Sequence, residues 1–339
     1  YPLTRTLYLA TGPWPDATTR GFVAFALSAE GQRAITVNSP GFFPLPNIEP
    51  RSVAPTVGAR YVNPDGSIAI VGYNDMSEMI SALDDQFSAD HPGIRFRPVL
   101  KGTRTGPPAL AAGTTLLAPM GAEFSPTELA EYRAKTGGEP VTFRMAHASL
   151  DPRALSGPLA IFVHRDSPVT SMSLSELADI FSGRKTGGWH PFGLAADRAL
   201  GLFFRARVLA GAEFACDFHG MAQSRDVVAE VASDPAAIGF AAGMRAAPGV
   251  KRLSLAPAVG ASPVALTEAN VRTGEYPLDR HLLLYVRQPI DPLARQYLRW
   301  VLSAEGQAVI ARGTLGYQPL NEFERAVESA KLAVLPGLP

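Results

Sequence analysis

Residues 276–320 have the sequence YPLDRHLLLYVRQPIDPLARQYLRWVLSAEGQAVIARGTLGYQPL, and residues 1–45 have the sequence YPLTRTLYLATGPWPDATTRGFVAFALSAEGQRAITVNSPGFFPL. The two stretches align without a gap at a constant offset of 275, and 18 of the 45 positions are identical. In each copy a short apolar run precedes an aspartate at a helix N-cap position (Asp16, Asp291), apolar residues at helical spacing follow, and a second short apolar run ends the copy. Each copy is therefore predicted to form a strand, a helix and a short strand, with Gly31 near the end of the first helix.

The bulk composition fits an ordered globular protein of 339 residues, with 46% hydrophobic and 18% charged residues. The formal net charge is zero, which argues against nucleic acid as the main partner. Cys216 is the single cysteine, so an intramolecular disulfide is excluded and the redox compartment stays open. No apolar run has the length of a membrane span. The chain begins at Tyr1 without a methionine, so we expect it to be processed or cut from something longer.

Apolar runs typical of strands alternate with amphipathic stretches typical of helices along most of the chain. This alternation favours an α/β fold with mainly parallel sheets. The principal expected elements are strands at 67–72, 94–100, 157–168 and 238–241, and helices at 76–87, 109–112, 126–135 and 173–181, the last capped by Ser173.

Three stretches in order resemble the phosphate-binding proteins of ABC transporters. They are GPLAIFVHRDSPVTSMSLSELADIFSGR at 157–184, DVVAEVASDPAAIGFAAG at 226–243, and YPLDRHLLLYV at 276–286 with LRWVLSAEGQAVIARGTLGYQPL at 298–320. The last pair resembles the return segment, the part of the chain that comes back to complete the first lobe.

The resemblance implies the two-lobe type 2 periplasmic binding protein fold. The substrate-binding domain would span 66–325, with lobe one at 66–150 plus 276–325 and lobe two at 157–262. Residues 46–65 are predicted to be a proline-rich linker and 326–339 a tail. A ligand would lie in the cleft between the lobes, where the strands of open α/β sheets end.

Two loop-to-helix junctions in lobe one are candidates for binding an oxyanion, because helix N-termini offer free N–H groups and a favourable dipole. The first holds Asn74, Asp75 and Met76, where Asp75 also fits a simple N-cap. The second holds Thr103, Arg104 and Thr105 in a glycine-flanked loop, with Thr105 in the place of the family's ligand-binding serine. An exposed turn is the alternative for this second loop.

A third junction, at 193–201, departs from the family. The places of its arginine, serine and threonine are occupied here by Leu194, Arg198 and Leu200, and Asp197 and Arg198 are the remaining polar candidates. The family's buried acid has no equivalent in the stretch APMGAE, where Glu123 is the only acid. The resemblance therefore implies a pocket that has lost much of its chemistry for phosphate.

No catalytic or metal-binding pattern stands out elsewhere. The six histidines (91, 147, 164, 190, 219 and 281) have no metal-ligand spacing and are interpreted as surface or packed residues. No Ser-His-Asp or paired-carboxylate signature is present, so the chain is predicted not to be an enzyme and to need no cofactor.

The resemblance implies a periplasmic or secreted solute-binding protein for phosphate or another small oxyanion, with ABC transporter membrane components as candidate partners. The alternative is an interaction module that keeps the fold without a solute. Residues 1–45 are predicted to duplicate the return segment and to be the end of a preceding similar domain. Otherwise they would pack on a second copy of the chain, because the helix leaves Phe22, Val23 and Phe25 without a core.

Overall fold

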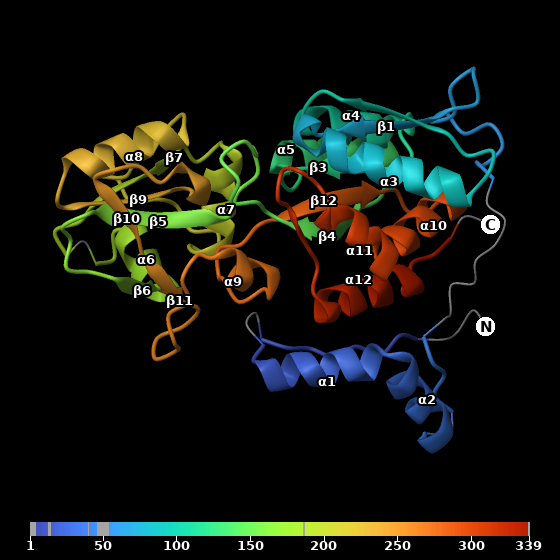
Figure 1. Ribbon diagram of the computed structural model, residues 1–339, viewed down its shortest axis with the longest axis horizontal. Coiled ribbons are helices and arrows are strands. Elements are labelled where there is room, and N and C mark those ends of the chain that lie inside the picture. The colour runs from blue at the N-terminus through green and yellow to red at the C-terminus, as the bar shows by residue number, and fades with distance from the viewer. Residues whose placement is uncertain (1–4, 13–14, 40, 46–53, 186, 338–339) are drawn as a thin grey trace. The chain divides into compact units, whose positions relative to one another are not determined.

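The computed structural model describes residues 5–12, 15–39, 41–45, 54–185 and 187–337 (Figure 1). The chain forms two compact units: unit 1 takes the residues up to Ala146, Leu282–Gly313 and those from Pro319 on, and unit 2 takes His147–His281 and Thr314–Gln318. None of the helices in the described ranges has the length and apolar content needed to traverse a lipid bilayer.

Unit 1 is a mixed α/β unit in which β1 and β2 pair in parallel and a further sheet has the strand order β13-β4-β12-β3. Backbone bonds from Leu116 N to Ala69 O (3.0 Å) and from Tyr73 N to Pro119 O (2.9 Å) join β1 to the segment of β3. Its elements are α1 (Ala17–Leu27), α2 (Ala29–Asn38), β1 (Ile68–Gly72), η1 (Asn74–Met76), α3 (Ser77–Asp90), β2 (Phe96–Leu100), η2 (Thr103–Thr105), α4 (Gly106–Ala112), β3 (Ala118–Met120), α5 (Pro126–Thr136), β4 (Val141–His147), β12 (His281–Val286), α10 (Pro292–Val301), α11 (Ala304–Ala311), β13 (Gln318–Pro319) and α12 (Glu322–Val334).

Unit 2 is built on a five-stranded sheet with the order β10-β5-β9-β7-β8, in which β7 runs parallel to both β8 and β9. A small parallel pair, β11-β6, accompanies it. The elements are β5 (Leu159–His164), β6 (Ser171–Ser173), α6 (Leu174–Phe181), β7 (His190–Leu194), α7 (Ala199–Arg207), β8 (His219–Met221), α8 (Ser224–Ser233), β9 (Ala237–Ala242), η3 (Gly243–Arg245), β10 (Val250–Arg252), β11 (Ser254–Ala256) and α9 (Glu268–Arg272).

The predicted α/β class and its principal elements are confirmed. Ser173 caps α6 as expected: its hydroxyl accepts from Glu176 N, and the Glu176 carboxylate accepts from Ser173 N, which completes a capping box. One expectation differs, because residues 193–194 end the strand β7 and do not belong to the predicted loop.

The core of unit 1 contains a buried acid. The phenol of Tyr297, on α10, donates to Asp84 Oδ1, on α3, over 2.7 Å, and the rings of Tyr297 and Phe87 lie 5.3 Å apart. Both Asp84 and Tyr297 are buried, and Asp84 Oδ2 has no hydrogen-bond partner among the described residues. Burial raises the pKa of Asp84 to about 8.

The two sequence copies have the same local structure. In each, the expected single helix is two helices, because a serine ends the first helix and caps the second: Ser28 between α1 and α2, and Ser303 between α10 and α11. Gly31 is therefore in the first turn of α2 and not at a helix end. A Cβ on Gly31 would lie 2.2 Å from Phe25 O, and the equivalent atom on Gly306 would lie 2.3 Å from a carbonyl oxygen, so both tight corners require glycine.

A glutamine clasp closes each copy. Gln32 Nε2 donates to Ala26 O (2.7 Å), and its Oε1 accepts from Leu45 N (2.6 Å). Gln307 Nε2 donates to Val301 O (2.9 Å), and its Oε1 accepts from Leu320 N (2.7 Å). Only in the second copy does the amide also donate into the sheet, to the carbonyl of Met145 in β4 (3.1 Å). The clasp therefore forms within each copy, whereas the additional bond to β4 depends on how the second copy packs in unit 1.

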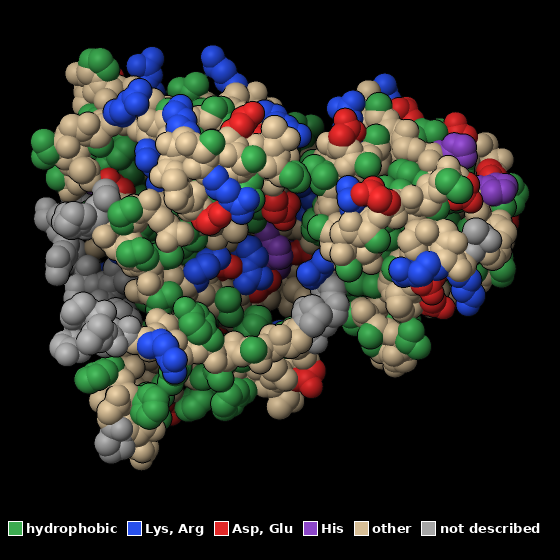
Figure 2. Space-filling model, turned by 180° about the vertical axis from the view of Figure 1, so that it is seen from behind, with side chains coloured by type: hydrophobic (Ala, Val, Ile, Leu, Met, Phe, Trp, Pro, Cys, Tyr) green, Lys and Arg blue, Asp and Glu red, His purple; other side chains and the backbone are tan. Residues whose placement is uncertain are grey.

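The copies differ in what covers them. Residues 5–12 form no strand, contrary to the prediction, whereas their counterparts at 280–287 include β12. Phe22 is 60% exposed, but its counterpart Tyr297 is fully buried. Helix α1 lies beside α12, where Val23 is buried (Figure 1). Further large apolar side chains of the N-terminal copy are exposed, namely Leu7, Tyr8, Leu9, Phe25, Val37, Phe42 and Phe43. Figure 2 shows hydrophobic side chains gathered over this copy at the lower left.

The predicted linker and tail both contain ordered contacts. In the linker, residues 46–53 lie outside the described ranges, but Thr56 Oγ1 and Tyr61 Oη donate to Asp291 Oδ2 over 2.6 and 2.8 Å. The tail contains much of α12. Its Glu328 Oε1 accepts a hydrogen bond from Arg144 Nε, on β4, over 2.6 Å. Both segments therefore pack against elements of unit 1.

Candidate functional site

Hydrogen bonding at the helix N-termini divides the described α-helices into two groups. Eight α-helices begin with a side chain that accepts from a first-turn N–H; they are α1, α2, α5, α6, α9, α10, α11 and α12. The other four, α3, α4, α7 and α8, have no side-chain cap. These four follow β1, β2, β7 and β8, which form two parallel pairs. The N-termini of α7 and α8 therefore leave N–H donors for a ligand or water at the carboxyl ends of the strands. At α3 and α4 the open donors lie at the starts of η1 and η2, because Ser77 N and Gly106 N donate to carbonyl oxygens of those turns and α4 continues with two prolines.

In unit 1 three loops at these strand ends are bonded to one another. Gly102 N donates to Gly72 O (2.9 Å), which joins the ends of β1 and β2. Gly121 N donates to Thr103 Oγ1 (3.3 Å), which joins the loop after β3 to η2. A Cβ on Gly121 would lie 2.4 Å from the ring of Tyr73, so glycine allows this ring to pack closely. The structure thus brings together the two predicted loops of lobe one.

The predicted residues of these loops have different environments. Asn74 is exposed, Asp75 is half-buried within η1, and the side chain of Met76 is fully buried, so Met76 can offer a ligand only backbone atoms. Asp75 does not cap α3, contrary to the alternative interpretation, because the chain enters that helix through η1 and Met76 holds the cap position.

The Thr105 hydroxyl contacts the carbonyl oxygens of Gly102 (2.7 Å) and Gly72 (3.2 Å). Its single proton is thus already donated to a backbone carbonyl, and the hydroxyl holds the ends of the two loops together. Thr103, whose hydroxyl accepts from Gly121 N, keeps its own proton available for another acceptor.

Arg104 is the cationic side chain of η2. It is 63% exposed, and its Nη1 lies 2.9 Å from Glu128 Oε2 in α5. That carboxylate is held in place because it also accepts from Ser125 N, in the capping box of α5. The guanidinium therefore has one fixed partner and keeps further N–H donors for an anion.

In unit 2 the predicted residues Asp197 and Arg198 are exposed and precede α7, with Arg198 at the cap position. Leu194 is buried at the end of β7 and contributes no polar group. A Cβ on Gly201 would lie 2.1 Å from Ala195 O, so glycine allows the first turn of α7 to approach the strand end closely. Backbone groups and Arg198 are the donors that this junction can offer.

The N-terminus of α8 was not predicted as part of a site. Ser224 has the sequence of an N-cap, but its hydroxyl accepts from Ala242 N in β9 (3.2 Å), and Gln223 at the cap position makes no side-chain bond. The bond spans 18 residues, so the sequence near Ser224 gave no signal for it.

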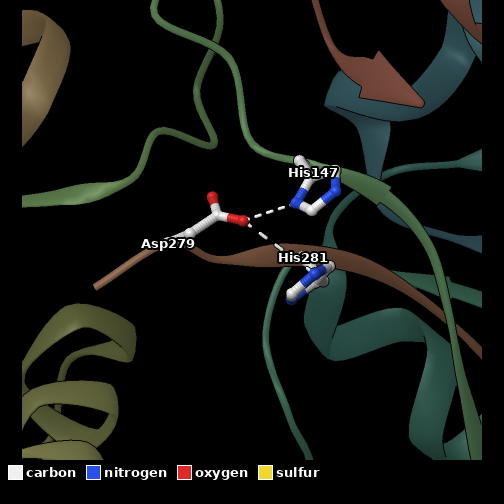
Figure 3. Close-up of side chains that lie close together, drawn as sticks. All are labelled: His147, Asp279 and His281. Atoms are coloured by element: carbon white, nitrogen blue, oxygen red, sulfur yellow. Dashed lines mark hydrogen bonds and ion pairs between the residues drawn. The ribbon is translucent and has the colours of Figure 1, made fainter. Parts of the chain in front are cut away.

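A second cluster brings together three side chains that could hold a metal ion. His147, Asp279 and His281 have donor atoms within 4.8 Å of one another, and this is the one such group of three within the described ranges (Figure 3). Sequence spacing gave no signal for this pair of histidines, because β4 and the start of β12 bring residues 134 positions apart into contact. The imidazole rings lie 4.7 Å apart.

The family model described as PBP superfamily domain matches residues 54–305, and the chain belongs to this family. The phosphate-binding protein PstS of Pseudomonas aeruginosa strain PAO1 is 29% identical over 280 residues, which cover 75% of this chain and 83% of that protein. The phosphate-binding protein PstS 2 of Streptococcus pneumoniae TIGR4 is 24% identical over 186 residues and covers 55% of each chain.

Solved structures share the fold. An ABC-type phosphate transport receptor from Vibrio cholerae covers 74% of this chain and 99% of its own at 18% identity, with a TM-score of 0.50. PstS from Borrelia burgdorferi covers 75% and 98% at 14% identity, with a TM-score of 0.51. The predicted type 2 periplasmic binding protein fold and the resemblance to phosphate-binding proteins are thereby confirmed. Family membership makes the chain a solute-binding protein and not an enzyme.

Proposed function

We propose that the protein binds phosphate or a similar small oxyanion without transforming it. The observation that supports this most directly is the set of four uncapped helices, all of which begin at the ends of parallel strands. Such N-termini bind anions through N–H groups and the helix dipole, without requiring several cationic side chains. The relatives named for phosphate binding support the same choice of ligand.

In unit 1 the proposed donors are the N–H groups at the starts of η1 and η2, which lead into α3 and α4, together with the Thr103 hydroxyl and the Arg104 guanidinium. In unit 2 they are the N–H groups at the starts of α7 and α8, with Arg198. That both sets serve a single ligand, as the resemblance implies, stays a prediction. The pocket is diverged in this proposal, since Leu194 stands where the family has an arginine.

Arg104→Ala is expected to weaken phosphate binding about 10-fold, because one charge-assisted hydrogen bond is lost. Isothermal titration calorimetry of the full chain with phosphate measures this. Arg133→Ala is the matched control, since Arg133 also pairs with a glutamate, Glu139, but lies in the last turn of α5. Equal losses in both variants would contradict a role for the η2 loop.

The titration series should include sulfate. Asp75, Glu123 and Glu128 are carboxylates in or beside these loops, and a carboxylate accepts a hydrogen bond from an anion only when that anion is protonated. Phosphate bound more tightly than sulfate would therefore favour a carboxylate in contact with the ligand. The absence of heat and of a thermal shift with every anion would overturn the proposed function and favour the alternative, an interaction module that has kept the fold.

We further propose that the protein acts outside the cytoplasm, in the periplasm or after secretion, and delivers its solute to ABC transporter membrane components. The support is the description of a solved structure with this fold as an ABC-type phosphate transport receptor. Co-purification with a transporter tests the partner.

We also infer that residues 1–45 are a duplicated return segment, originally the end of a similar domain. The support is the matched clasp of Gln32 and Gln307, together with the matched caps and glycine corners. Several exposed apolar side chains of this segment correspond to side chains that are buried in the second copy, among them Leu7 with Leu282, Tyr8 with Leu283, and Phe22 with Tyr297.

The exposed apolar face is expected to make the chain self-associate, because a contiguous apolar patch is covered when two copies meet. Sedimentation velocity over a range of concentrations should show a reversible increase in mass that Phe22→Glu weakens. Thr18→Glu, at an exposed polar position of the same helix, is the control. A strictly monomeric wild-type chain would contradict self-association through this face.

A further inference from the structure

We propose that His147, Asp279 and His281 form a binding site for one divalent transition-metal ion, with Zn²⁺ as the best match. Nothing in the anion-binding role requires such a site, so the proposal stands apart from the proposed function. The three residues belong to unit 2.

The backbone places the three side chains together. His147 ends β4, His281 begins β12, and Asp279 lies two residues earlier. Ala148 N donates to Arg280 O over 2.8 Å, which fixes the two segments side by side. In extended chain, residues two apart face the same side, so Asp279 and His281 point toward His147 while Arg280 points elsewhere, over the ring of Phe203.

The distances are those of a nearly assembled ligand set. Asp279 Oδ2 lies 2.6 Å from His147 Nδ1 and 3.9 Å from His281 Nε2 (Figure 3). Ligand atoms bound to Zn²⁺ at about 2.0–2.2 Å lie at most about 4.4 Å from one another. All three donor atoms lie within 4.8 Å of one another, so a small rotation of one side chain brings the set to metal-binding distances.

The chemistry also matches. Two imidazoles and one carboxylate are a ligand set that suits Zn²⁺, and they leave a fourth position for water or an anion. The side chain of Asp279 is 6% exposed, and its Oδ1 has no hydrogen-bond partner among the described residues. A buried carboxylate with an unsatisfied oxygen is costly, and a bound cation would offset that cost.

A histidine–aspartate contact alone does not indicate a metal, and the same chain shows the difference. His190 Nδ1 and Asp234 Oδ2 also lie 2.6 Å apart, but the His190 side chain is 60% exposed and the pair belongs to no group of three within the described ranges. The cluster at His147 differs by its burial and by the third donor. The His281 side chain is 20% exposed, which gives an ion a way in.

The test is a titration of the untagged, metal-free full chain with zinc chloride, followed by calorimetry and by thermal unfolding. One equivalent of Zn²⁺ should bind and raise the melting temperature, because the ion binds the folded state. His281→Ala and Asp279→Asn should each weaken binding about 100-fold or more, since each removes one of three ligands. His190→Ala should bind as the wild-type chain does.

His281→Ala is the decisive variant, because the His281 side chain is partly exposed and the chain is expected to fold without it. Thermal unfolding of the metal-free variant checks that it is folded. The proposal is overturned if the wild-type chain binds no stoichiometric Zn²⁺, or if His281→Ala binds as tightly as the wild-type chain. In either case the cluster is a buried histidine–aspartate hydrogen bond with a neighbouring imidazole.

Discussion

Replacing Gln307 by alanine is expected to lower the free energy of unfolding by about 2–4 kcal/mol, since it removes three hydrogen bonds at a buried site and leaves their partners unsatisfied. The lost bonds are those to Val301 O, Leu320 N and Met145 O. The same change at Gln32 is expected to alter global stability by less than about 0.5 kcal/mol, because that clasp has no bond into the sheet and lies in a segment whose apolar face is largely exposed.

Chemical denaturation of the two full-chain variants measures this difference. Hydrogen exchange should additionally show faster exchange at Leu45 in Gln32→Ala, which reports loss of the local clasp. Equal destabilisation by the two substitutions would mean that residues 1–45 are part of the cooperative core. It would contradict the inference that these residues are a duplicated segment from another domain.

Asp84→Asn is expected to stabilise the protein at pH 8 by up to about 5 kcal/mol, the value that a difference of about four pKa units corresponds to. An ordinary aspartate has a pKa of about 4, whereas burial raises the pKa of Asp84 to about 8 in the folded state. Between these values the unfolded chain has released the proton and the folded chain still holds it, so the free energy of unfolding of the wild type falls as the pH rises from about 4 to 8. Asparagine removes this loss and can still accept from Tyr297.

Denaturation of the wild-type chain and Asp84→Asn at several pH values tests the linkage. The advantage of the variant should be absent near pH 4 and should grow toward pH 8. Asp90→Asn, at an exposed position of the same helix, is the control and should change little. A stability gain that is independent of pH would show that the carboxyl group of Asp84 titrates normally.

Local sequence signals were sufficient for much of the fold. The continuous apolar run before Gly72 predicted β1, and Ser173 predicted the start of α6, because strand patterning and capping act over a few residues. The same reasoning failed at residues 7–10. Their apolar pattern is that of a strand, but a strand forms only beside a partner, and none pairs with these residues in the described structure.

The site was predictable only in part, for the same physical reason. The change from strand pattern to helix pattern indicated the 72–76 and 101–105 junctions, and the structure joins them through Gly102 and Gly72. The role of Ser224 and the meeting of His147 with His281 depend on contacts between distant residues. Neighbouring sequence does not encode such contacts, so spacing rules could not detect them.

The clasp also explains which positions of the two copies stayed alike. The identical run Leu27–Gln32 holds the serine cap, the glycine corner and the clasp glutamine, which bond within the segment. The outward positions diverged: Phe22 lacks the hydroxyl with which Tyr297 meets Asp84. The two copies thus share the residues that bond within the segment and differ in the residues that fit the segment to its surroundings. The first copy therefore lacks side chains that the second copy uses to pack in unit 1.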